Sequence, residues 1–274
     1  MILLVASQKD PASLNIAKQV LKRYPFKVTG ETFQENPTFS ANLKEEKVTL
    51  TILNEETINA QHLTENFPKS SLIVFISRHS STSGKPTLSV HTPGNLGPAE
   101  LGGLPRQVSI SPATAMRDAL KALAYFKEGM QLAYEVSYEC THHGPSLNTP
   151  TMFVELGSSP KQWHDSKAAE AVAHAAMSAI GKFGVSENTA VLGIGGTHYN
   201  QRFTHMSLEG EAIFGHMIPK YAVPSVDAEM LLQCVDKTLE KVECAFLDWK
   251  GIKSADKPQL LNALKEAELP YKKI

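Results

Sequence analysis

Seven of the ten histidines in this sequence lie in segments rich in Gly, Pro, Ser and Thr. They are His79, His91, His142, His143, His198, His205 and His216. Imidazole titrates near neutral pH, moves protons and binds zinc. Several of these histidines follow an apolar run that predicts a strand, and loops at strand ends carry the ligand sites of open α/β sheets. The grouping predicts a histidine-rich hydrolytic pocket.

The adjacent pair His142 and His143 raises a question of orientation. On an extended backbone the two rings would point to opposite faces, so only one could face a given pocket unless the turn at Gly144-Pro145 brings them together. Glu139 and Glu155 are within reach of the same pocket. Imidazole and carboxylate both suit zinc, but no H-E-x-x-H spacing is present. The residues alone leave two alternatives open, a metal site or histidines that act as general bases and phosphate donors without metal.

A set of basic residues lies in or near the same loops, namely Arg78, Lys85, Arg106, Arg202 and Lys220. With Tyr199 and Phe203 nearby, this set is typical of a surface that binds phosphate and stacks bases, although ordinary solubilising charge explains it equally well. The formal net charge is −1, which excludes the overall basicity of most nucleic-acid binders. Any contact with RNA would have to be a local patch.

Several other classes of protein are disfavoured. Neither a P-loop nor a G-x-G-x-x-G turn before a helix is present, and no G-x-S-x-G elbow appears. Three widely spaced cysteines predict no disulfide framework, which fits a reducing cytoplasm. The apolar runs are far shorter than the roughly 20 residues of a membrane helix. We therefore expect a cytoplasmic protein without a membrane partner and, in the absence of heptads, a monomer.

The elements that must position these residues alternate along the chain. Apolar, β-rich runs predict strands at 1–7, 48–53, 72–76, 131–138, 151–156, 190–194 and 244–247, with a further short run at 212–217. Helices are predicted from Asp10-Pro11 onward and at 112–126, 166–183, 227–242 and 257–267, with a weaker one at 60–67. Residues 77–112 are expected to form a loop too long for an ordinary connection, of the kind that is usually functional or disordered. We predict one α/β domain over 1–274 with a mixed, mostly parallel central sheet flanked by helices.

The histidine-bearing segments, taken in order, resemble a known motif series. Segments 77–81 (Ser-Arg-His-Ser-Ser), 91–95 (His-Thr-Pro-Gly-Asn), 141–145 (Thr-His-His-Gly-Pro), 195–199 (Gly-Gly-Thr-His-Tyr) and 215–221 (Gly-His-Met-Ile-Pro-Lys-Tyr) are similar to those of the archaeal and plant type of D-aminoacyl-tRNA deacylase. This resemblance implies an esterase that removes D-amino acids from the terminal ribose of tRNA. It also implies zinc dependence and a fold similar to peptidyl-tRNA hydrolase and the nucleoside phosphorylases.

On this resemblance we expect five residues to be zinc ligands or proton-transfer groups: His79, His142, His143, His198 and Glu155. Six more are expected to bind D-aminoacyl-tRNA: Arg78, His91, Tyr199, Arg202, His216 and Lys220. An aminoacyl ester is already activated, so a zinc-bound water with its pKa lowered to about 7 would be an adequate nucleophile. Discrimination between D and L substrates would come from a pocket that sterically rejects the L side chain.

Two alternatives use the same residues. The principal one is a zinc-dependent peptidase or amidohydrolase that acts on a small molecule and is indifferent to tRNA. The other is a non-catalytic module that binds RNA ends or nucleotides, with the histidines as hydrogen-bond donors. The near-neutral charge argues mildly against a pure binder, because such proteins rely on a larger basic surface.

Overall fold

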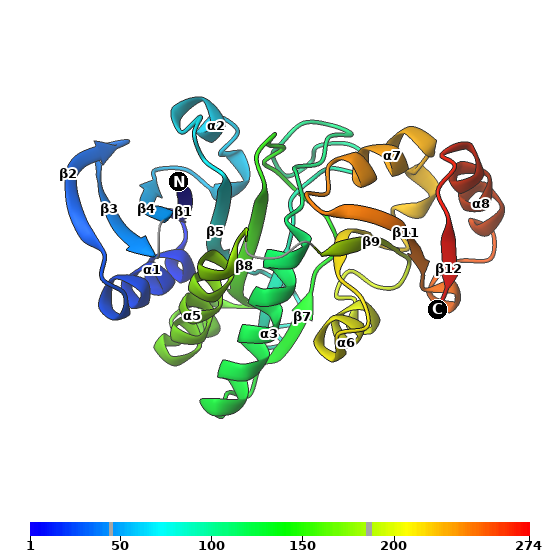
Figure 1. The fold of residues 1–274 in the computed structure, drawn as a ribbon. Helices are drawn as coiled ribbons and strands as arrows, with labels where there is room; N and C mark the ends of the chain where they lie inside the picture. The colour runs from blue at the N-terminus through cyan, green and yellow to red at the C-terminus, as the bar shows by residue number, and fades with distance from the viewer. Residues whose placement is uncertain (44–45, 185–187) are drawn as a thin grey trace.

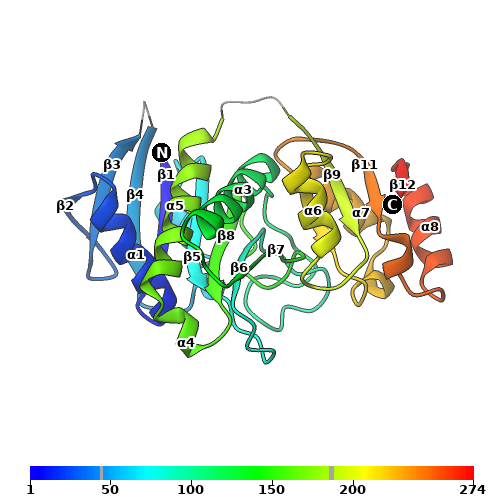
Figure 2. The ribbon, with the colours of Figure 1, turned by 90° about the horizontal axis from the view of Figure 1, so that it is seen from below.

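A large mixed sheet forms the centre of the molecule, and a smaller parallel sheet lies beside it (Figures 1 and 2). The computed structural model describes residues 1–43, 46–184 and 188–274. The large sheet has the strand order β2-β3-β4-β1-β5-β8-β6-β7. Its strands are β1 (Ile2–Ser7), β2 (Lys27–Phe33), β3 (Asn36–Leu43), β4 (Glu46–Leu53), β5 (Leu72–Arg78), β6 (Thr87–His91), β7 (Glu135–Tyr138) and β8 (Thr151–Gly157).

Strand direction changes within the half of the large sheet that carries the histidines. Strands β4, β1, β5 and β8 are mutually parallel, whereas β6 is antiparallel to β8 and parallel to β7. Along β8, Ser77 of β5 pairs with Glu155, and His91 of β6 pairs with Phe153. Ser77, near the end of β5, and His91, at the end of β6, therefore arrive beside β8 from opposite directions and lie two residues apart in register.

The two faces of the large sheet are covered differently. Helices α1 (Pro11–Arg23), α3 (Ala113–Gly129) and α5 (Ser166–Lys182) pack in a row over one face (Figure 2). The alanine-rich α5 permits close packing because most of its buried residues are alanines. The other face carries a separate core that includes Phe75 and Phe153 and is covered in part by η1 (Thr57–Asn59) and α2 (Leu63–Asn66). Side chains alternate between the faces, so Glu155 lies on the same face as Phe153.

The small sheet has the order β10-β9-β11-β12 and all its neighbouring strands are parallel. Its strands are β9 (Thr189–Ile194), β10 (Phe214–Ile218), β11 (Lys241–Leu247) and β12 (Tyr271–Lys273). The accompanying helices are α6 (Gln201–Glu209), α7 (Ala228–Asp236) and α8 (Lys257–Glu266), with short 3₁₀ turns η2 (Val223–Ser225) and η3 (Trp249–Gly251). The strand ends of this sheet and the helices α7 and α8 enclose a core of their own.

The predicted α/β class, with a mostly parallel mixed sheet between helices, is confirmed. Asp10 caps α1 as expected, since its side chain accepts a hydrogen bond from Ser13 N at 3.0 Å. The short helix α4 (Pro160–Trp163) was not predicted. Among the residues that the structure describes, no helix is long and apolar enough to cross a membrane.

Other boundaries differ from the prediction for physical reasons. The hairpin β2–β3 was missed because β2 is largely exposed, β3 is only partly buried, and neither strand shows apolar alternation. The expected loop 77–112 contains β6, and the expected polar loop after Ile194 contains α6, which Asn200 caps through Phe203 N. The helix predicted at 227–242 ends at Asp236, because the chain there turns into β11. The prediction also placed in one central sheet the strands that the structure divides between two.

The cap of α5 gives a test of the fold. Asp165 accepts hydrogen bonds from Lys167 N at 2.9 Å, Ala168 N at 3.1 Å and Tyr134 Oη at 2.9 Å. Asp165→Ala should therefore lower the free energy of unfolding by about 1–2 kcal/mol, measured by urea denaturation. Asp256 occupies the same position before α8 but makes no capping hydrogen bond, and its Oδ2 atom is buried without a hydrogen-bond partner in the described ranges of the chain, so Asp256→Ala should not lower the free energy of unfolding. Equal losses in the two variants would contradict the assignment.

Candidate active site

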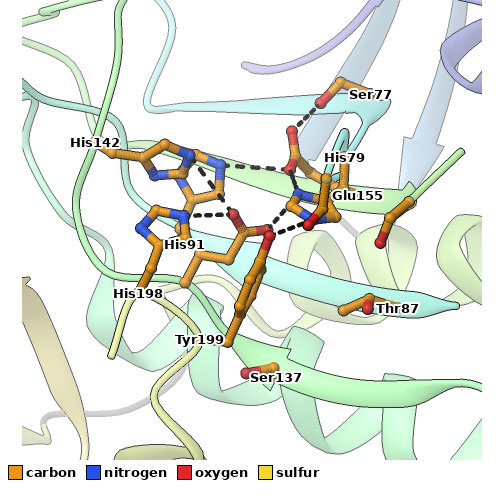
Figure 3. Close-up of polar contacts among 12 residues, drawn as sticks. Ser77, His79, Thr87, His91, Ser137, His142, Glu155, His198 and Tyr199 are labelled. Carbon is orange, nitrogen blue, oxygen red and sulfur yellow. Dashed lines mark hydrogen bonds and ion pairs between the residues drawn. The ribbon is translucent and has the colours of Figure 1, made fainter. Parts of the chain in front are cut away.

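Two buried glutamates stand at the centre of a histidine cluster (Figure 3). Glu139 follows β7 directly and Glu155 lies on β8. His79, just beyond β5, lies between them, with its Nδ1 atom 3.1 Å from Glu139 Oε1 and 3.7 Å from Glu155 Oε2. The Glu139 side chain is 0 % exposed. Because burying a carboxylate without a partner is costly, the surrounding imidazoles are a condition of this arrangement.

Each glutamate also contacts other side chains. Glu139 Oε2 lies 3.0 Å from His198 Nε2 and 3.6 Å from His142 Nε2. Glu155 Oε1 accepts a hydrogen bond from Ser77 Oγ at 2.7 Å, and Glu155 Oε2 lies 3.7 Å from His91 Nε2. Glu139 thus connects the small sheet, through His198, to the large sheet.

His142 and His143 face the same site, which settles the question of their orientation. His143 adopts a positive φ of 44°, and the two rings lie with centroids 4.2 Å apart. His91 packs against both, at 4.3 and 4.9 Å. The extended backbone on which the rings would diverge is therefore not adopted. A Cβ added to the next residue, Gly144, would lie 2.1 Å from Gly103 N, so this turn requires glycine.

The charged groups and the neutral histidines lie in different parts of the cluster. Burial alone would lower the pKa of His79, but Glu139 and Glu155 outweigh it and raise the pKa to about 11. Burial alone would raise the pKa of Glu155, but the neighbouring imidazoles of His79 and His91 lower it to about 2. The pKa of Glu139 is lowered in the same way, chiefly by His79. Burial lowers the pKa of His142, and that of His143 to about 4. At pH 7 the pair His142–His143 is therefore neutral, which is the form that binds metals.

The cluster opens into a cavity of about 430 Å³. Its walls include Arg78, Ile58, Leu101 and Tyr199 together with the catalytic candidates. A neighbouring cavity of about 330 Å³ shares Leu101, His142 and His143 and is also lined by Tyr221 and several apolar residues. The two histidines thus form part of the wall of both cavities.

The structure brings most of the predicted site residues together. His79, His142, His143, His198 and Glu155 form the cluster, joined by His91 and by Tyr199, whose Oη lies 2.8 Å from His79 Nε2. Arg78 lies at the cavity wall, where it pairs with Glu56 at 2.9 Å. Arg202 and Lys220 line neither cavity; Arg202 lies 3.6 Å from Asp248, and Lys220 is exposed after β10.

His216, which was expected to bind substrate, lies in the interior of the protein and lines neither cavity. Its side chain is fully buried, with Nε2 donating to the carbonyl oxygens of Ser109 and Lys237, each at 3.1 Å. Nδ1 lies 3.1 Å from Thr141 Oγ1. Burial lowers the pKa of His216 to about 4, so this side chain stays neutral and holds the segment before His142.

Glu139 and Tyr221 are the site residues that the expected set leaves out. The position of Glu139, directly after a predicted strand and before the two histidines, is the signal that could have ranked it with Glu155. Tyr221 Oη lies 3.3 Å from His198 Nδ1, and the last motif segment ends on this residue.

Several imidazoles and carboxylates are placed as metal ligands would be. Three groups have ligand atoms within 4.8 Å of one another: His91–His142–His143, Glu139–His142–His198 and His79–Glu139–Glu155. Both nitrogens of His91 and Oε1 of Glu139 are buried with no aligned hydrogen-bond partner among the described residues. His142 Nδ1 donates to Cys140 O at 2.8 Å, and His143 Nδ1 donates to Gly144 O at 2.7 Å, so Nε2 of each ring keeps its lone pair. The residues fit a metal site.

An α/β fold with imidazoles and carboxylates converging on a cavity is typical of hydrolytic enzymes. Comparison with known proteins narrows this class. The family model for D-aminoacyl-tRNA deacylase matches residues 66–272, and the chain belongs to this family. The resemblance inferred from the motif series is confirmed.

Full-length relatives support the assignment. Proteins named D-aminoacyl-tRNA deacylase are 34% identical in Pyrococcus abyssi, over 99% of both chains, and 35% identical in Thermococcus onnurineus, over 97% of both. A Methanococcus vannielii protein of the same name is 34% identical over 99% of both chains. A crystal structure described as a conserved protein of unknown function matches with a TM-score of 0.87 and 33% identity, covering 100% of this chain and 95% of the other.

The charge on Glu155 predicts a pH dependence of stability. Its folded-state pKa of about 2 lies below the ordinary value of 4.5, so the stability it contributes is complete above about pH 4.5 and is lost as the pH falls toward 2. In chelator-treated protein, Glu155→Gln should flatten the fall of unfolding free energy between about pH 5 and pH 2.5, measured by urea denaturation. The exposed control Glu209→Gln should keep the wild-type slope; equal slopes in all three proteins would refute the assignment.

Proposed function

We propose that this protein hydrolyses the ester bond of D-aminoacyl-tRNA and releases the free D-amino acid and tRNA. Membership of the family supports the substrate, and the burial of Glu139 among three imidazoles is the observation that carries the chemistry. In this reaction the oxygen of water bonds to the ester carbonyl carbon, the bond from that carbon to the ribose oxygen breaks, and a proton returns to the ribose oxygen.

We propose zinc as the cofactor, with ligands drawn from the His91, His142, His143, His198, Glu139 and Glu155 side chains. His79, which was expected as a ligand, is assigned instead to the charged partner of the two carboxylates, because a doubly protonated ring has no lone pair for a metal. The unpartnered nitrogens of His91 and the fixed tautomers of His142 and His143 support this set. When bound, zinc supplies a Lewis acid that lowers the pKa of water and polarises an ester carbonyl.

Tyr199 is positioned to donate a proton toward the substrate. His79 is charged, so both ring nitrogens carry hydrogen: Nδ1 faces Glu139 Oε1, and Nε2 donates to Tyr199 Oη at 2.8 Å. The Tyr199 hydroxyl accepts that bond and keeps its own hydrogen for a group in the cavity. We assign it to the developing charge on the ester oxygens, where a fixed donor is most effective. This role replaces the stacking role expected for Tyr199.

The two adjoining cavities suit the two ends of an aminoacyl-adenosine. We place the D-amino acid in the 430 Å³ cavity beside the carboxylates and the terminal adenosine in the 330 Å³ cavity. Tyr221, which is 58% exposed, offers a ring for stacking on the base. Rejection of L substrates would then depend on the wall that the cavities share, which includes Leu101 and the histidine pair.

We also propose that the enzyme works as a monomer in the cytoplasm. Every group in the cluster comes from one chain, so no partner is needed to complete it. The three cysteines are free thiols, in keeping with a reducing compartment.

The stereochemical and metal requirements can be tested together. The purified protein should release labelled tyrosine from D-Tyr-tRNA but not from L-Tyr-tRNA, because the side chain of the L ester meets the cavity wall. A chelator should abolish release and zinc should restore it. Release from neither ester by folded, zinc-loaded protein, with cleavage of small peptides or amides instead, would favour the small-molecule hydrolase.

The central role of Glu139 predicts a linked loss of metal and activity. Glu139→Gln should lower zinc content, measured by atomic absorption, and reduce the rate on D-Tyr-tRNA by at least about a hundredfold. Glu128→Gln, at a highly exposed glutamate on α3, should leave both unchanged. Full zinc content and a wild-type rate in folded Glu139→Gln would contradict the proposed site.

A further inference from the structure

The carboxyl edge of the small sheet carries lysines close to the proposed active site. Because its strands are parallel, their carboxyl ends lie along one edge, with Ile194 paired to Ile218 on one side and to Leu247 on the other, and Leu247 paired to Lys273. The chain leaves β9 toward His198, leaves β10 at Lys220 and Tyr221, and leaves β11 at Trp249 and Lys250. One end of this edge therefore belongs to the catalytic cluster and the other ends at Lys273.

Two ammonium groups converge on one ring at the far end of this edge. Lys273 Nζ lies 3.9 Å and Lys257 Nζ lies 4.4 Å from the centre of the Trp249 ring. Within the described part of the chain, these two lysines form no ion pair with a carboxylate, and neither do Lys220 and Lys250. Like charges gathered in this way repel one another, and an anion bound among them would relieve the repulsion.

We define the basic edge as Lys220 after β10, Lys250 after β11, and Lys257 and Lys273, whose ammonium groups lie over Trp249. Backbone contacts join this edge to the catalytic loop. Lys220 N donates to Gly196 O at 2.9 Å, and Asp248 N donates to Ile194 O at 2.8 Å. Arg202, in α6 just after His198, lies 3.6 Å from the Asp248 carboxylate. The edge and the loop that carries His198 are thus parts of one packed unit.

We propose that the basic edge binds the phosphodiester backbone of the acceptor end of tRNA. This inference rests on the proposed function, which places the aminoacylated ribose at the catalytic cluster. Each nucleotide upstream of that ribose adds one negative phosphodiester. From β9 to β12 the edge spans two strand spacings, on the order of 10 Å, so it lies within reach of the first upstream nucleotides. A chain with a net charge of −1 needs such a local patch to hold RNA.

The variant Lys250→Gln/Lys257→Gln/Lys273→Gln tests the surface by its affinity for deacylated tRNA, measured between 50 and 200 mM salt. Loss of three phosphate contacts should make the slope of log affinity against log salt shallower by about two and weaken binding at least about tenfold at low salt. The matched control is Lys18→Gln/Lys22→Gln/Lys27→Gln, three exposed lysines on α1 and β2 at the opposite end of the molecule (Figure 1). It should bind like the wild type. A triple variant of the edge with wild-type affinity and slope would overturn the proposal.

Activity on two substrates separates this proposal from the proposed function. The edge variant should have a KM for D-Tyr-tRNA raised at least about tenfold but an unchanged kcat/KM for D-tyrosyl-adenosine, which has no upstream phosphates. Equal losses on both substrates would show that the lysines act on the catalytic site and would refute RNA docking. Wild-type protein that binds tRNA with the expected salt slope but cleaves neither ester would refute the proposed function and leave the docking surface standing.

Discussion

The burial of the Glu139 carboxylate is the constraint on which the rest of the site depends. A charged group enclosed by protein is stable only when opposite charge and hydrogen-bond donors surround it. Here His79, after β5, and His198, after β9, supply them, and the neutral ring of His142, after β7, brings its Nε2 atom to 3.6 Å from the same carboxylate. Each of these segments must therefore end at the same point in space, and the cavity forms where they meet.

The topology of the two sheets satisfies this constraint. Because β6 runs against β8, His91 reaches Phe153 while Ser77 reaches Glu155, and both ends stop over one face of the large sheet. The small sheet contributes from the side, since its parallel strands direct their carboxyl ends toward the cluster. In our proposal the two sheets therefore have different roles. The large sheet holds the carboxylates, and the small sheet carries the groups that bind the tRNA.

The fold could be predicted from the sequence where local pattern and burial agree. The buried strands β1, β5, β8 and β9 and the long helices α1, α3 and α5 were found because apolar runs mark the strands and apolar periodicity marks the helices. A capping residue, Asp10, also marks the start of α1. The Ser111 cap predicted for α3 is not formed, because that helix begins after Pro112 without a side-chain cap. The exposed hairpin β2–β3 and the short strand β6 were missed, since pairing with neighbouring strands, and not their own composition, stabilises them. The hydrophobic pattern of the sequence also could not show that the strands divide into two sheets.

For the site, the sequence by itself determined the kinds of chemistry, the loops that carry it and the family. Imidazoles at the ends of predicted strands indicated a pocket lined by histidines. Only the tertiary structure decided which groups share it: it placed Glu139 at the centre, turned His142 and His143 to the same side and enclosed His216 in the interior. The physical reason is that burial and the distance between charges are set by contacts between segments far apart in the chain.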